Sequence, residues 1–101
     1  MSKYAVLFLV VLFPFCFSVA ADESGGEATY KARCAGCHGK DGVPKSFAKG
    51  SPAFNDEAWK KANPVEAIEK VVAEGRNKMP PFKNKLAPEE IRAVAAYLKT
   101  L

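Results

Sequence analysis

The chain has 101 residues, of which 49% are hydrophobic and 26% charged, and its formal net charge at pH 7 is +4. This length allows one domain, and the hydrophobic fraction is typical of a globular protein. The lysines and arginines are spread along the chain without a dense basic stripe, which argues against a nucleic-acid-binding protein.

Residues 1–21 have the layout of a secretory signal peptide. Lys3 supplies a positive charge, an apolar run follows over residues 4–17, and small residues end the segment. The run is 14 residues long, shorter than the roughly 20 that span a bilayer. We therefore expect cleavage, with Cys16 in the discarded part and no stable membrane insertion of the mature chain. Residues 22–101 are then a single exported domain, located in the periplasm or, as the alternative, the thylakoid lumen.

The mature chain has the pattern of helices joined by loops, without the alternation typical of strands. Residues 22–26 are expected to be a flexible start, because two adjacent glycines weaken a first helical turn. A helix is predicted over residues 27–34, which places Tyr30 and Cys34 on one face. Residues 39–52 contain three glycines and two prolines and are predicted to be a loop.

Two helices are predicted in the middle of the chain. Asn55 can cap a short helix over residues 56–61. Asn63 is suited to cap the next helix, with Pro64 at its first position and Gly75 as its stop. The apolar stripe of this second helix consists of Val65, Ile68, Val71 and Val72.

A second loop, over residues 76–85, leads to the last helix. Pro88 fits the first helical position, and the two glutamates that follow it favour the positive end of the helix dipole. The buried stripe of this helix is predicted to consist of Ile91, Val94, Leu98 and Leu101, with Tyr97 beside it. The pattern therefore indicates an all-α domain.

The sequence Cys34-Ala35-Gly36-Cys37-His38 matches C-x-x-C-H, the attachment motif of a c-type haem. Two thiols at this spacing can each add to one vinyl group of a porphyrin, and the adjacent imidazole can then ligate the iron. A buried, covalently fixed macrocycle would also add core to a domain of about 80 residues, a size at which a hydrophobic core alone stabilises weakly. We expect one haem c, bound through Cys34 and Cys37.

Two other chemistries use closely spaced cysteines. A redox-active disulfide would need a βαβ pattern around the motif, and none is present. A zinc site would use Cys34, Cys37 and His38 and leave its fourth ligand unassigned. Both interpretations are weaker than the haem interpretation.

Met79 is the candidate for the second axial ligand, opposite His38. The sequence holds no second histidine, and Met79 is the only methionine besides Met1. A thioether is a weak neutral donor that the chain must hold in place, and the two prolines after Met79 stiffen its loop. Methionine as a core filler is the alternative, and the neighbouring Lys78 could replace Met79 at high pH. His and Met ligation favours Fe(II) and suits electron transfer.

In combination these motifs resemble a class I monohaem cytochrome c of the short bacterial and algal type. The residues that carry the resemblance are Gly26-x-x-x-Tyr30-x-x-x-Cys34-x-x-Cys37-His38, the loop over residues 75–82, and Val94 and Tyr97 in the last helix. The resemblance covers about residues 26–101 and implies that fold, with about four helices packed around one covalently bound haem. It also implies that the first and last helices cross where Gly26 and Tyr30 meet Val94 and Tyr97.

The resemblance suggests roles for three further cofactor-binding residues. The carbonyl of Pro52 would accept a hydrogen bond from His38 and strengthen it as a ligand, with Pro44 as a competing candidate. Asn77 would donate near the Met79 sulfur or act only as a turn former. Trp59 would pack on the haem and donate to a propionate, or lie in the core with its indole N–H on a backbone carbonyl.

The function that this reasoning favours is a soluble, monomeric one-electron carrier and not an enzyme. Its partners would be redox proteins with acidic docking surfaces, attracted by lysines around the haem pocket. A haem-based sensor or enzyme would need a labile sixth position, and a cytochrome subunit docked on a larger oxidoreductase would show an extended apolar patch. The lysines concerned are Lys40, Lys45, Lys49, Lys60, Lys61, Lys78, Lys83 and Lys85.

Overall fold

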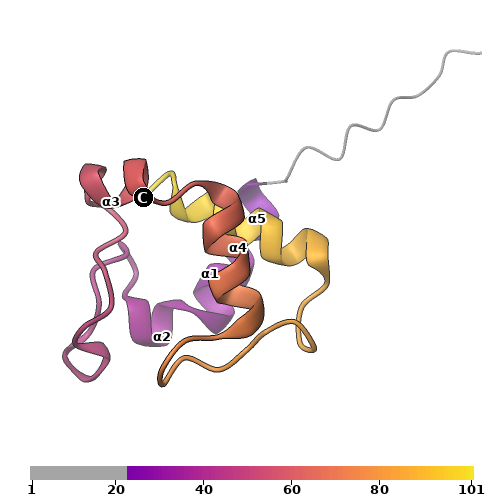
Figure 1. Ribbon diagram of the computed structural model, residues 1–101, viewed down its shortest axis with the longest axis horizontal. Coiled ribbons are helices and arrows are strands. Elements are labelled where there is room, and N and C mark those ends of the chain that lie inside the picture. Colours follow the sequence, from indigo (N-terminus) through magenta and orange to yellow (C-terminus); the bar gives the residue numbers. More distant parts are fainter. Residues whose placement is uncertain (1–22) are drawn as a thin grey trace, which may run out of the picture.

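The computed structural model describes residues 23–101, so the predicted signal peptide over residues 1–21 lies outside the described residues. The elements are α1 (Glu23–Arg33), α2 (Ala35–His38), the 3₁₀ helix η1 (Ser46–Ala48), α3 (Glu57–Ala62), α4 (Val65–Glu74) and α5 (Pro88–Leu98) (Figure 1). Within residues 23–101, β pairing is limited to two isolated bridges. The predicted all-α class is confirmed, with α1, α3, α4 and α5 as the frame and α2 as a four-residue turn.

The first and last helices cross at a glycine, as the resemblance implies. A Cβ atom on Gly26 would collide with the carbonyl oxygen of Ala93 and lie 3.0 Å from the Cβ of Tyr97. One turn further along α1, the rings of Tyr30 and Tyr97 lie 5.4 Å apart between centroids. Tyr30 and Val94 are fully buried at this crossing. Only glycine at position 26 permits such a close approach of the two backbones.

The start of α1 differs from the prediction. Residues 22–26 were expected to be flexible, yet the helix begins at Glu23 and continues through Gly25 and Gly26. The packing of Gly26 against α5 offsets the low helix propensity of glycine, because tertiary contacts stabilise a helix more than intrinsic propensity does. The helical hydrogen bonding continues one residue past Arg33, where the Cys34 N–H donates to the Tyr30 carbonyl at 2.9 Å.

The caps of α3 and α4 also differ from the prediction. Asp56, not Asn55, caps α3, since its Oδ2 accepts from the backbone N–H of Trp59 at 3.3 Å. Asn63 does not cap the start of α4. Its side-chain amide instead donates to the Trp59 carbonyl at 2.9 Å and satisfies the end of α3. Pro64 therefore occupies the N-cap position of α4.

The C-terminal end of α4 and the start of α5 agree with the prediction. α4 stops at Gly75, whose φ of 75° is in the left-handed region that favours glycine. α5 starts at Pro88, and the side chain of Glu90 accepts from the N–H of Ala87 at 2.9 Å. The core between α1, α4 and α5 consists of Tyr30, Phe54, Ile68, Val72, Phe82, Leu86, Ile91, Val94, Ala95 and Leu98. Among residues 23–101 no helix combines the length and hydropathy needed to span a bilayer.

Candidate haem site

Cys34 is the N-cap residue of the short helix α2, and Cys37 lies inside this helix. The carbonyl of Cys34 accepts from the N–H groups of Cys37 at 3.1 Å and His38 at 2.9 Å, so the motif is one tight turn. Cys34 is half-buried, Cys37 is exposed, and both are free thiols. Burial raises the pKa of the Cys34 thiol to about 11, with a further contribution from Cys37. A thiol with a raised pKa is poorly suited to redox or nucleophilic chemistry, which needs the thiolate.

The ring of His38 is half-buried, and its Nδ1 has no hydrogen-bond partner among the described residues. Burial lowers the pKa of this imidazole, which favours the neutral form that ligates metals. A buried ring nitrogen without a hydrogen-bond partner costs free energy unless another group, such as a metal or a further acceptor, binds to the ring. Together with two unpaired thiols beside it, this donor set fits a covalently attached haem. Within residues 23–101 no three His, Cys, Asp or Glu residues converge on a metal position, so the zinc interpretation finds no ligand set.

An aromatic row extends from His38. The Phe54 ring lies 4.8 Å from the His38 ring and 4.7 Å from the indole of Trp59, between centroids. Trp59 is half-buried in α3 and packs against the core. We find no hydrogen bond from its indole N–H to another described residue, so the alternative of a backbone carbonyl partner gains no support. Its predicted contact with the haem stays a prediction.

Pro52 and Pro44 were the candidates for accepting a hydrogen bond from His38. In this structure neither carbonyl is bonded to Nδ1. Pro52 is exposed and Pro44 is half-buried. Two residues after Pro52, the Phe54 N–H donates to the Gly42 carbonyl at 3.0 Å. The roles of Pro52 and Pro44 as acceptors stay predictions.

A buried phenol supports the end of the motif, and sequence reasoning missed it. The hydroxyl of Tyr30 donates to the carbonyl of Gly39, the residue after His38, at 2.5 Å. The same carbonyl accepts from the Gly42 N–H at 3.3 Å, and Gly39 has a φ of 79°. Burial raises the pKa of the Tyr30 hydroxyl to about 12. The sequence predicted a packing role for the Tyr30 ring, whereas its hydroxyl also bonds the residue that follows His38.

Met79 is half-buried, packs against the core, and lies in a loop with a defined backbone. Its N–H and carbonyl form a two-bond bridge with Arg76, at 2.9 and 3.1 Å. Between them, Asn77 has a φ of 54°, a left-handed conformation that asparagine tolerates better than most residues. This conformation supports the turn-former role of Asn77, and its predicted hydrogen bond near the Met79 sulfur stays a prediction. The loop is anchored to α4 by the Phe82 N–H, which donates to the Val72 carbonyl at 3.0 Å.

Gly75 sets the path of this loop. A Cβ atom at Gly75 would lie 2.6 Å from the carbonyl oxygen of Met79 and 2.8 Å from the nitrogen of Pro81. The positive φ and the close approach both require glycine. The backbone around Met79 is therefore held by glycine at one end and by the two prolines at the other.

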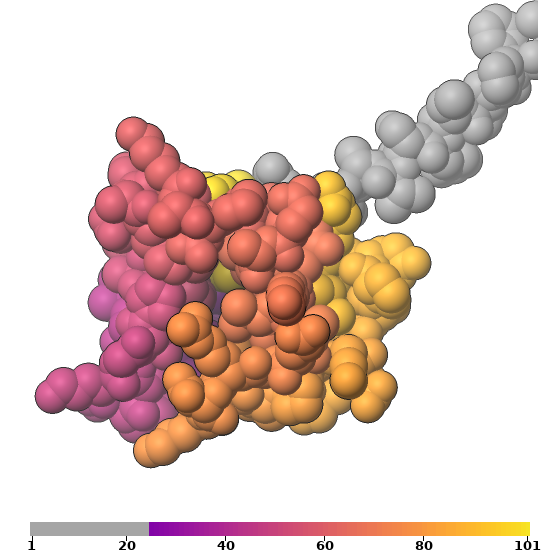
Figure 2. All heavy atoms as spheres, in the orientation of Figure 1, coloured from indigo at the N-terminus to yellow at the C-terminus, as the bar shows by residue number. Residues whose placement is uncertain are grey.

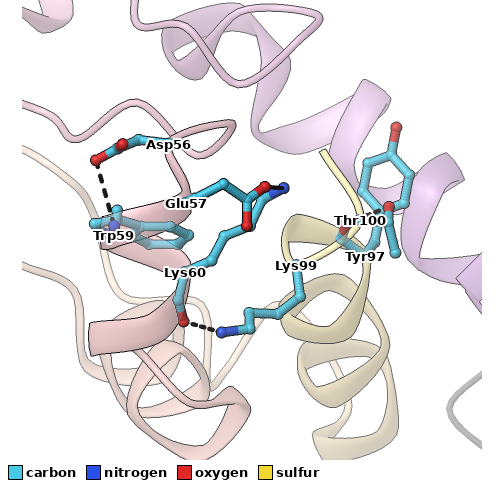
Figure 3. Close-up of polar contacts among 7 residues, drawn as sticks. All are labelled: Asp56, Glu57, Trp59, Lys60, Tyr97, Lys99 and Thr100. Atoms are coloured by element: carbon cyan, nitrogen blue, oxygen red, sulfur yellow. Dashed lines mark hydrogen bonds and ion pairs between the residues drawn. The ribbon is translucent and has the colours of Figure 1, made fainter.

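Figure 3 shows a lysine that ties α5 to the end of α3. The ammonium of Lys99 donates to the carbonyl of Lys60 and, at 2.8 Å, to that of Asn63. A cation at a helix C-terminus satisfies free carbonyls and interacts favourably with the helix dipole. This contact holds the helix that carries Trp59, and the sequence contains no local signal for it because the partners are more than 35 residues away.

The predicted lysine rim is largely exposed. Lys60 is the exception, because its side chain is half-buried and pairs with Glu57 at 3.2 Å. Lys85 lies over the ring of Phe82, with its ammonium 5.4 Å from the centroid. The lysines of the rim that are exposed are Lys40, Lys45, Lys49, Lys61, Lys78, Lys83 and Lys85.

Comparison with known proteins bears on the identity of the chain. Residues 21–98 match the family model described as cytochrome C oxidase, cbb3-type, subunit III. The chain is similar to cytochrome c6 of Nostoc sp., with 37% identity over 98 residues that cover 92% of this chain and 86% of the relative. It is also similar to the cbb3-type cytochrome c oxidase subunit FixPc of Rhizobium leguminosarum, with 35% identity over 88 residues, 74% of this chain but 29% of that protein. The solved structure of the KustC0563 c-type cytochrome superposes with a TM-score of 0.71 at 35% identity, covering 74% of this chain and 94% of that one.

Proposed function

Because the chain belongs to the small monohaem class I cytochromes c, which are electron carriers and not enzymes, we propose that His38 and Met79 are the two axial ligands of its haem. One c-type haem, bound covalently, is the cofactor of this family. We assign its attachment to Cys34, at the start of α2, and Cys37, inside α2, which are both free thiols. When bound, the haem supplies one-electron Fe(II)/Fe(III) chemistry.

The observation that carries the proposal is the rigid loop around Met79. The bridge to Arg76, the positive φ of Gly75 and the anchor at Phe82 fix the backbone that presents the thioether. Such support is what a weak neutral donor needs to stay on iron in both oxidation states. If His38 and Met79 both held the iron, they would keep substrates and gases from it, which would leave electron transfer as its role. His38 is the only histidine, so a distal histidine for sensing or peroxidase chemistry is not available.

The partners and location follow from charge and from the N-terminal segment. Exposed lysines in the loops around α2 and Met79 favour redox partners with acidic docking surfaces. Residues 1–21 would direct export and be cleaved, leaving residues 22–101 as a monomeric carrier. The periplasm is the location we propose, and the thylakoid lumen is the alternative. These proposals are supported by the similarity to cytochrome c6.

A second candidate is a cytochrome subunit that stays docked on a larger oxidoreductase. The matched family model and FixPc both favour it, although this chain spans 29% of the FixPc length. The two candidates share the same haem ligation and differ in assembly. Size-exclusion chromatography of native membrane extracts separates them, because a permanent subunit elutes with the oxidase and a free carrier elutes alone.

The ligation is tested by visible spectra of the holoprotein, oxidised and reduced, with carbon monoxide added to the reduced form. We expect a low-spin spectrum, the weak Fe(III)–thioether charge-transfer band, and no response to carbon monoxide. The Met79→Ala variant should lose the band and bind carbon monoxide, whereas the matched control Lys78→Ala should behave as the wild type. Carbon monoxide binding by the wild-type protein would overturn the proposed ligation and favour a sensor.

A further inference from the structure

The phenyl ring of Phe54 contacts both His38 and Trp59. Phe54 is buried, with 6% of its surface exposed. The planes of the phenyl and imidazole rings meet at 31°, and their centroids are 4.8 Å apart. The phenyl and indole planes meet at 41°, with their centroids 4.7 Å apart. Both pairs are closer to stacked than to perpendicular, and at this separation the attraction between aromatic rings depends on their relative orientation. The angle of one ring therefore influences the angle of the next.

The backbone holds Phe54 against the loop that follows the haem motif. The Phe54 N–H donates to the carbonyl of Gly42 at 3.0 Å. Gly42 has a φ of 83°, and a Cβ atom on it would lie 2.9 Å from the Cβ of Phe54. Figures 1 and 2 show the loop over residues 39–52 and α3 on the same side of the molecule, the left in this view. Because Phe54 is bonded to this loop and buried, its ring has little freedom to turn away from His38.

The helix that carries the indole is held at both ends. At the start of α3, the N–H of Trp59 donates to the Asp56 carboxylate at 3.3 Å, a bond that Figure 3 shows. At its end, the Asn63 side-chain amide donates to the Trp59 carbonyl at 2.9 Å, and the Lys99 ammonium donates to the Asn63 carbonyl at 2.8 Å. The indole is therefore carried by a fixed backbone and supports the phenyl ring of Phe54.

The Nδ1 atom of His38 is buried and has no hydrogen-bond partner within residues 23–101. In this part of the chain the angle of the imidazole therefore depends on packing, and Phe54 supplies the aromatic contact to it. Neighbours that orient a ligand histidine also tune the metal that it holds. A change in the phenyl ring should then be visible at the iron.

We propose that Phe54 is a positioning residue that sets the angle of the His38 imidazole plane about its bond to iron. The proposal rests on the His38 ligation proposed above and adds a residue that acts through this ligand. An imidazole is a π donor, so the angle of its plane decides which d orbital of low-spin Fe(III) carries the unpaired electron. The distribution of that electron spreads the proton NMR signals of the haem methyl groups. A fixed imidazole gives a wide spread, and one that turns among several angles gives a narrow spread.

The test is the proton NMR spectrum of the oxidised holoprotein. Phe54→Leu keeps an apolar side chain but removes the ring, so the spread of the haem methyl shifts should narrow. Phe54→Tyr keeps the ring and should keep the wild-type spread. Ile91→Ala is the control for a loosened core, because Ile91 is also 6% exposed and lies in α5. It should lower the free energy of unfolding and leave the spread unchanged.

A second pair of variants displaces the ring without removing it. Gly42→Ala puts a methyl group against the Cβ of Phe54, so the haem methyl shifts should change. Gly50→Ala is the matched control, because Gly50 also has a positive φ, of 105°, but nothing lies within 4 Å of an added Cβ atom. Its haem methyl shifts should stay at the wild-type values.

The outcomes separate the role of Phe54 from the ligation itself. A wild-type holoprotein that is high-spin or lacks the Fe(III)–thioether band would refute the ligation proposed above. A low-spin wild type whose spread is unchanged by Phe54→Leu would refute only the role of Phe54. Equal narrowing in Ile91→Ala would also overturn that role, because it would assign the effect to a general loosening of the core.

Discussion

Replacement of Tyr30 by phenylalanine removes one buried hydroxyl and nothing else. The ring is fully buried, and its hydroxyl donates to the Gly39 carbonyl at 2.5 Å. Loss of a buried hydrogen bond costs about 1–2 kcal/mol of unfolding free energy. The Gly39 carbonyl keeps its second donor, the Gly42 N–H at 3.3 Å, so it is not left without a partner. We therefore expect Tyr30→Phe to cost about 1 kcal/mol at pH 8.

The effect of Tyr30→Phe on the free energy of unfolding should change sign at high pH. Burial raises the pKa of Tyr30 from 10.0 to about 12. Below pH 10 the phenol is protonated in the folded and unfolded states, and its hydrogen bond contributes fully. Above pH 10 the unfolded chain loses the proton first, so the wild-type protein loses up to about 1.4 kcal/mol per pH unit until pH 12. The phenylalanine variant has no such proton, and its stability should match that of the wild type near pH 11.

Guanidinium unfolding of the holoprotein, followed by far-UV circular dichroism between pH 8 and pH 11.5, measures both curves. Tyr97→Phe is the matched control, because no hydrogen bond from its hydroxyl to another described residue is found and its ring faces Tyr30. This control should shift the free energy of unfolding at pH 8 by less than about 0.5 kcal/mol. A Tyr30→Phe cost that stays constant from pH 8 to pH 11.5 would refute the argument that the phenol is buried and bonded as described.

Three other substitutions test the packing and loop arguments. Gly26→Ala should lower the free energy of unfolding by at least about 2 kcal/mol, because the added methyl group meets the α5 backbone. Gly36→Ala is the control and should have no measurable effect, because the space around Gly36 is open. Equal effects of the two substitutions would contradict the close crossing of α1 and α5. Gly75→Ala should weaken the Fe(III)–thioether band and admit carbon monoxide, because its methyl group displaces the Met79 carbonyl; an unchanged spectrum would show that the loop tolerates the change. Lys99→Met should lower the unfolding free energy by about 1–2 kcal/mol through the lost charged hydrogen bonds to the end of α3, and a neutral result would mean that water replaces them.

The second half of the fold was predictable because its signals are local. Gly75 ends α4 and Pro88 starts α5, since each residue type has a backbone preference that acts within one turn. The apolar spacing correctly predicted Ile91, Val94 and Leu98 in the core. Leu101, the fourth residue of the predicted stripe, lies beyond the end of α5 and is only partly buried. The haem motif and the loop around Met79 were also visible in the sequence, since both depend on residues that are adjacent in the chain. The roles assigned to Pro52, Trp59 and Asn77 remain predictions.

The predicted helix caps were wrong where neighbouring residues have side chains of similar capping ability. Asn55 and Asp56 are both good N-caps, and only the path of the chain places the Asp56 carboxylate over the start of α3. Asn63 has the residue type of a cap for the helix after it, yet it caps the helix before it. The propensity of two glycines also argued against the early start of α1, and the close contact of Gly26 with α5 outweighed it.

No local sequence pattern predicts the contacts that surround the haem motif. Tyr30 was predicted to pack against α5, and its ring does so, but its hydroxyl reaches past the motif to Gly39. One residue thus joins the crossing of α1 and α5 to the backbone after His38. Any loosening of that crossing should therefore change the setting of His38 as well as the stability of the protein. The Gly26→Ala variant then has a second expected outcome, a shift in the reduction potential, whereas a fall in stability with an unchanged potential would show that the two are independent.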